Sequence, residues 1–146
     1  MPSLSSVLVD PARRRRVIED AVQVVEAEVS GKGGFTGIAI KTGFAVVKKA
    51  KPDFVPGSMN MLMDEFAAKI DPFWEKCQAE GADARTYFTR NSGLIADALL
   101  GITDQKARNV AGPVRAVYDK LRPEAKKHVV DAMPRLGDLV KKHASV

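Results

Sequence analysis

The feature of this sequence that most constrains its fold is the repeated spacing of apolar residues at three- and four-residue intervals. Val55, Met59, Leu62, Phe66 and Ile70 follow one another in this way. On an α-helix such residues share one face, which must be buried against another element. Comparable stripes occur over 17–29, 87–99, 107–121 and 129–140. The spacing predicts a chain built from amphipathic helices.

Proline and glycine residues divide these stripes into short segments. Asp10-Pro11 and Asp71-Pro72 each predict a helix start, with Asp as N-cap and Pro at the first helical position. Arg122-Pro123 predicts the start of the last helical stretch, and Gly81 and Gly101 predict helix ends. We therefore expect an all-α fold, a compact orthogonal or irregular bundle of about six to eight short helices.

The most apolar segment is 36–49, whose apolar residues lie nearly all round a helix. This pattern predicts a central buried helix, in which Gly37 and Gly43 let neighbouring backbones approach closely. A short buried strand over 44–47 is the alternative. With only 6% aromatic residues, the core must be largely aliphatic.

The length of 146 residues is typical of one domain, so we expect a single helical domain over 1–146 with residues 1–9 as a flexible N-terminal segment. Aligning Lys51-Pro52 with Arg122-Pro123 also superposes Ala45-Val46 on Ala116-Val117. Duplication would give two pseudo-equivalent halves, and chance similarity between helices is the alternative.

A cytoplasmic location is expected from the cysteine content and from the distribution of apolar residues. Cys77 is the single cysteine, which excludes an internal disulfide and is compatible with a reducing compartment. The first ten residues have no charged leader of the kind that precedes a signal sequence. No stretch approaches the roughly 20 apolar residues of a membrane-spanning helix.

The sequence contains no motif of an enzyme, and we expect neither a metal nor a cofactor. His128 and His143 lack metal-ligand spacing, although Glu124, His128 and Asp131 would share a helical face. A solvated face is the simpler interpretation. The glycines of 31–34 follow a helix rather than a strand, so they predict a helix end instead of a phosphate-binding loop.

Basic residues suggest one kind of partner, a nucleic acid or another polyanion. The net charge is +5, and the stretch from Gln105 to Val146 carries ten Lys and Arg against four Asp and Glu. Ordinary surface ion pairs are the alternative. The candidate contacts for weak, sequence-independent binding are Arg13, Arg14, Arg15, Arg16, Arg108, Arg115, Arg122, Lys126 and Lys127.

Apolar residues suggest a second kind of site, either a pocket for a small apolar ligand or an interface. Methionines adapt to irregular apolar shapes, and three of them lie within 59–63. Self-association would use the apolar faces around Val55–Ile70, and an ordinary core is the alternative. The candidate residues are Ile38, Phe44, Met59, Leu62, Met63, Phe66 and Trp74.

Several local motifs carry a resemblance that extends over nearly the whole chain. They are 26–29 (EAEV), 37–41 (GIAIK), 46–49 (VVKK), 71–74 (DPFW), 95–100 (IADALL), 103–104 (TD) and 126–130 (KKHVV). This order is similar to that of a family of short bacterial all-helical proteins of unknown function. The resemblance implies no activity and no functional residues, so the leading hypothesis is a non-catalytic protein for binding or assembly.

Overall fold

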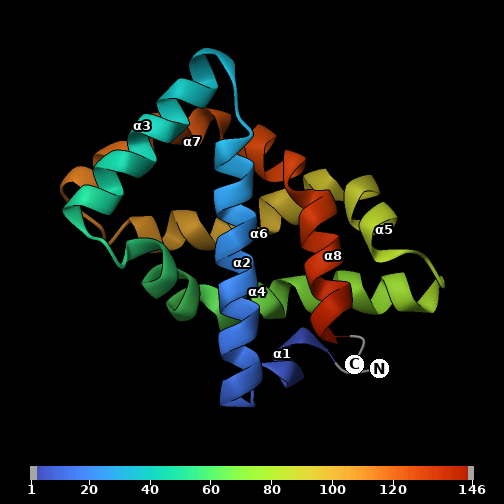
Figure 1. Ribbon diagram of the computed structural model, residues 1–146. Helices are drawn as coiled ribbons and strands as arrows, with labels where there is room; N and C mark the ends of the chain where they lie inside the picture. Colours follow the sequence, from blue (N-terminus) through green and yellow to red (C-terminus); the bar gives the residue numbers. More distant parts are fainter. Residues whose placement is uncertain (1–2, 145–146) are drawn as a thin grey trace.

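The computed structural model describes residues 3–144, and this part of the chain forms eight helices and no strand (Figure 1). The predicted all-α class is confirmed. The helices are α1 (Leu4–Val7), α2 (Pro11–Ser30), α3 (Gly34–Ala50), α4 (Phe54–Ala79), α5 (Ala84–Arg90), α6 (Ser92–Ala107), α7 (Pro113–Asp131) and α8 (Met133–Ala144).

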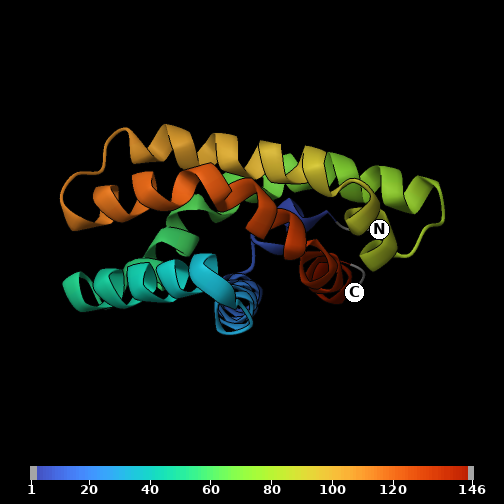
Figure 2. The same cartoon turned by 90° about the horizontal axis from the view of Figure 1, so that it is seen from above.

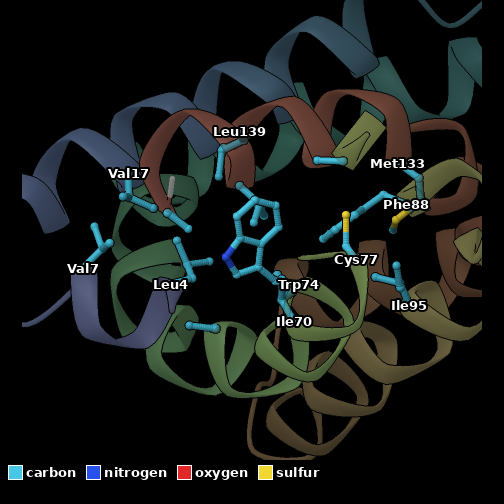
Figure 3. Packing of buried hydrophobic residues seen from close by; sticks show 14 of the residues in the cluster. Leu4, Val7, Val17, Ile70, Trp74, Cys77, Phe88, Ile95, Met133 and Leu139 are labelled. Carbon is cyan, nitrogen blue, oxygen red and sulfur yellow. The ribbon is translucent and has the colours of Figure 1, made fainter. Parts of the chain in front are cut away.

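One hydrophobic core is shared by α1, α2, α4, α5, α6 and α8, which we call the body. Trp74 of α4 lies in the middle of this core, between Leu4 of α1 and Cys77 (Figure 3). Phe88 of α5 and Ile95 of α6 are completely buried beside it. The body is closed by a close approach of α5 to α8, where a Cβ added at Gly137 would lie 2.7 Å from the backbone oxygen of Ala84.

The helices α3 and α7 lie side by side to one side of this core, which α7 reaches with Val129 and Val130 near its C-terminal end, and we call them the arm (Figures 1 and 2). None of the α7 residues is fully buried, and in α3 the only large side chains that are fully buried, outside Phe35 and Thr36, are those of Ile40 and Val47. The predicted central buried helix is therefore wrong. The segment is helical, not a strand, but only one of its faces is covered.

Two predictions about the N-terminal half are corrected by the position of Asp71. This residue does not start a helix, because α4 continues through Pro72 to Ala79. Its carboxylate instead accepts hydrogen bonds from the backbone N–H groups of Leu4, at 2.8 Å, and Ser5, at 3.2 Å. Residues 3–9 are consequently not a loose segment, since α1 is held against α4 with its apolar side chains in the core.

Some of the remaining helix boundaries agree with the local sequence signals, and others do not. Asp10 acts as the predicted N-cap of α2, and Asp83 caps α5. Gly101 and Pro123, by contrast, lie inside α6 and α7. Pro52 precedes a new helix, whereas Pro123 lies inside α7. The alignment of Lys51-Pro52 with Arg122-Pro123, which suggested two equivalent halves, therefore does not join structurally equivalent positions. None of the described helices has the length and apolarity needed to span a bilayer.

Candidate functional site

The side of α3 that faces α7 is shaped by Gly43. A Cβ at this position would lie 2.9 Å from Cγ1 of Val117 and 3.2 Å from Cδ1 of Leu121. The two helices therefore approach closely along one line of α3, where Ile40 and Val47 are also buried. Contacts along this line leave the opposite side of the helix uncovered.

The uncovered side of α3 carries apolar residues among lysines. Ile38 is 63% exposed and Val46 is 42% exposed, which places both among the most exposed large apolar residues of the described chain. We define the α3 outer face by its exposed residues Ile38, Lys41, Thr42, Ala45, Val46 and Lys49. Isolated exposed apolar side chains are common on protein surfaces, but here they belong to the most apolar segment of the sequence.

The charge of the α3 outer face is entirely positive. No acidic residue occurs in the sequence between Ser30 and Asp53, whereas this interval contains five lysines. Lys48 lies 3.8 Å from Glu26 of α2, and no ion pair is formed by Lys41 or Lys49 within residues 3–144. The face thus combines apolar side chains with uncompensated cations.

The apolar candidates predicted from the sequence are not brought together as a pocket. Leu62, Met63 and Trp74 are buried in the body, and Met59 and Phe66 pack partly buried against the core. Ile38 and Phe44 lie in the arm, exposed and half-buried respectively. The stripe over 55–70 turns its large apolar side chains inward, apart from Met61, which is 64% exposed. These residues are therefore not assembled into one pocket, and Ile38 is the member of the predicted set that lies exposed on the surface of the described chain.

The basic residues around α7 are mostly engaged in local ion pairs. Arg115 pairs with Asp119 at 3.0 Å, and Lys126 pairs with Asp97 of α6 at 3.1 Å. Arg108 lies just after α6 rather than on α7, so the arginines spaced seven apart do not form a stripe on one helix. Lys127 is exposed. The alternative of an ordinary ion-paired surface describes this region better than a polyanion track.

Arg122 has a structural partner in Asp104, which joins α6 to α7. Its Nε and Nη2 atoms donate to the two carboxylate oxygens at 2.7 and 2.9 Å, and the Tyr118 hydroxyl donates to the same carboxylate. The hydrogen bonds from Arg122 and then from Tyr118 hold the pKa of Asp104 below its usual range. This constellation fastens the arm to α6 and needs no ligand.

The four consecutive arginines at the start of α2 divide between the two sides of the helix. Arg14 is structural, since its Nη1 lies 2.7 Å from Oδ1 of Asp64 and its Nη2 donates to the backbone oxygen of Asn60. Arg15 lines a shallow cavity of about 310 Å³ on that same side. Arg13 and Arg16 turn to the other side, toward the last turn of α8.

Between α2 and α8 lies a cavity of about 420 Å³, which we call the α2–α8 cleft. Its lining residues are Arg13, Arg16, Glu19, Asp20, Lys142 and His143. Oδ2 of Asp20 lies 2.8 Å from Nζ of Lys142 and 2.7 Å from Nε2 of His143. The hydrogen bond from Lys142, followed by that from His143, lowers the pKa of Asp20 although burial opposes it.

Sequence reasoning selected the arginines of this cleft but missed Asp20, Lys142 and His143. Asp20 is separated from His143 by 123 positions, and no local motif signals a contact over that distance. His143 is only 8% exposed, so the Asp20 contact also fixes the end of α8 against α2.

The thiol of Cys77 and the ring nitrogens of His128 are both buried. Burial raises the pKa of the Cys77 thiol, whose Sγ contacts the backbone oxygen of Ala82 at 3.3 Å, so the nucleophilic thiolate is disfavoured. In the described residues no group of three potential ligands is placed to hold a metal ion. Both ring nitrogens of His128 are buried without a hydrogen-bond partner, and burial lowers its pKa.

Comparisons with known proteins identify a family but no function. The model of a family of unknown function (DUF6918) matches residues 4–144. Neither the curated proteins nor the solved structures gave a match to the chain.

Proposed function

Because the chain belongs to this family of unknown function, we propose its role from its own geometry. It is a non-catalytic docking protein that binds an acidic protein partner through the α3 outer face. The observation that carries the proposal is the mismatch between the apolar character of α3 and its peripheral position. A cytoplasmic location is part of this proposal, because a single buried cysteine is compatible with a reducing compartment.

The apolar part of the proposal concerns Ile38 and Val46. These side chains lie eight positions apart, two turns along the helix and roughly 12 Å at 1.5 Å per residue. Full burial of a branched aliphatic side chain contributes roughly 1.5–3 kcal/mol relative to exposure. A partner that covers both side chains would therefore gain this burial free energy on binding.

The charge of the face selects the partner. Lys41 and Lys49 flank the apolar anchors, so an acidic surface would form a charged rim around an apolar centre, as in many protein interfaces. A second copy would present the same lysines and be repelled. A lipid surface fits less well, because Thr42 and Lys49 interrupt the apolar strip and the face lacks the bulky anchors of interfacial helices.

Site-specific photo-crosslinking in cells that naturally produce the protein tests this proposal. A photoreactive amino acid replaces Thr42 at the centre of the α3 outer face, and the matched control replaces Thr89, an exposed threonine of α5. We expect a discrete adduct with one protein from position 42 only. Binding of the purified partner should fall with salt concentration, and the Lys41→Glu/Lys49→Glu double variant should weaken it at least about tenfold.

Three outcomes would contradict the proposal. One is an adduct with a second copy of the chain, and another is equal adduct formation from position 89. The third is partner binding that is insensitive to salt and to charge reversal. Stronger binding to vesicles of anionic phospholipid than to any protein would reassign the face to a membrane surface.

A further inference from the structure

A second site, independent of the α3 outer face, lies in the α2–α8 cleft. We propose that this cleft binds the phosphate group of a small molecule, with Arg13 and Arg16 as the principal contacts. The cavity of about 420 Å³ falls within the usual range of small-ligand sites, roughly 300–1,000 Å³.

The negative charge of Asp20 in the cleft is already compensated, whereas the charges of the two arginines are not. Asp20 already accepts hydrogen bonds from Lys142 and His143. These two residues of α8 compensate its negative charge. Arg13 and Arg16 form no ion pair within residues 3–144. The two guanidinium groups therefore line the cavity with their hydrogen-bonding capacity unused.

Neither Arg13 nor Arg16 has an ion pair within the described residues that would offset the unfavourable position of its charge near the start of α2. Cations in the first turns of a helix oppose its dipole, at a cost of a few tenths of a kcal/mol each. Arg14 offsets that cost through Asp64 and Asn60, whereas Arg13 and Arg16 have no such contact. An anion bound between them would supply it.

The spacing of the two arginines indicates the chemistry of the ligand. Arg13 and Arg16 are three positions apart, so their side chains leave the helix on the same face about 5–6 Å apart at Cβ. Guanidinium groups match the oxygens of a phosphate in paired, charge-assisted hydrogen bonds. Glu19 at the rim of the cleft repels anions, which disfavours a long polyanion and favours a compact, highly charged group.

Calorimetric titration of the full-length protein with sodium pyrophosphate, and separately with inorganic phosphate, at low ionic strength tests the site. Arg15 supplies the matched control, because it is the neighbouring exposed arginine but lines the opposite side of α2. We expect Arg16→Gln to weaken pyrophosphate binding about tenfold or more, the value of one charge-assisted contact. Arg15→Gln should change the affinity by less than about twofold, within the range of a screened surface charge.

A third variant is expected to increase the affinity for pyrophosphate. Glu19→Gln removes the only carboxylate in the lining that has no partner there, so it should tighten pyrophosphate binding. Unchanged melting curves for all three variants confirm that folding is preserved. Equal losses in Arg15→Gln and Arg16→Gln, tighter binding of a DNA duplex than of pyrophosphate, or no heat of binding at millimolar ligand would each overturn the site.

Discussion

The body and the arm of this protein bury their apolar residues to different extents. In the body, Phe88, Ile95 and Val140 are completely buried among several helices. In the arm, α3 packs closely against α7 on one side, and Ile38 on its other side is 63% exposed. The comparison teaches that apolar content alone does not place a helix in the core, because close contact on one face can leave the other face free.

The largest expected contrast between the two regions comes from the same substitution made in each. Phe88→Ala in the body should lower the free energy of unfolding by about 3–5 kcal/mol, since it leaves a cavity among packed helices. Phe44→Ala in the arm should cost less than about half as much, because its half-buried ring already contacts solvent. Urea unfolding followed by circular dichroism measures both, and equal costs would break the distinction between body and arm.

A second contrast concerns the two glycines at helix contacts. In Gly137→Ala the new Cβ meets the backbone of Ala84 and Arg85, which cannot move aside, so we expect a loss of about 1–3 kcal/mol. In Gly43→Ala the obstacle is the side chains of Val117 and Leu121. Their displacement should be offset by the gain in helix propensity of about 1 kcal/mol.

Thermal melts of the two glycine variants are sufficient for this comparison. We expect a clear drop in Tm for Gly137→Ala and little change for Gly43→Ala. A larger drop for Gly43→Ala would mean that the contact between α3 and α7 is as rigid as the contact between α5 and α8.

The smallest expected effect concerns His128 of α7 and the dependence of protein stability on pH. Burial and the nearby Lys32 and Lys127 lower the pKa of this histidine, while Asp131 and Glu124 oppose the shift. The folded protein therefore binds fewer protons than the unfolded chain as pH falls below about 6.5, the value for an unfolded histidine. Stability is complete above that pH and is lost as pH falls toward the lowered pKa.

His128→Leu tests this linkage, because it removes both the titrating group and its two unpartnered nitrogens. Between pH 7 and pH 5 the unfolding free energy of the variant should decline less than that of the unmodified protein. A pH dependence identical to that of the unmodified protein would show that His128 is hydrated in solution.

The sequence sufficed for the fold class and for those helix starts that depend on local chemistry. Asp10 with Pro11, and Asp83, cap helices as their residue types predict. Asp71 with Pro72 has the same local pattern, but its carboxylate is used 67 positions away at Leu4, and α4 continues through the proline. Tertiary contact overrode the local signal in that case.

The candidate sites likewise depend on tertiary contacts that the sequence pattern does not reveal. The arginines at 13–16 were evident as a run, but their division into structural Arg14 and cleft-lining Arg13 and Arg16 depends on which helices lie beside α2. The apolar pattern of α3 was equally evident. Its peripheral position could not be read from the pattern, because periodicity shows which residues are apolar and not how many faces are covered.

The measurement that tests the central claim most directly compares Ile38→Ser with Ile40→Ser, two substitutions of the same residue type on opposite sides of α3. Ile40 is 7% exposed and Ile38 is 63% exposed. We expect a loss of unfolding free energy of about 2–4 kcal/mol for Ile40→Ser and less than about 0.5 kcal/mol for Ile38→Ser. Equal losses, or a loss for Ile38→Ser that grows with protein concentration, would contradict a free outer face on α3.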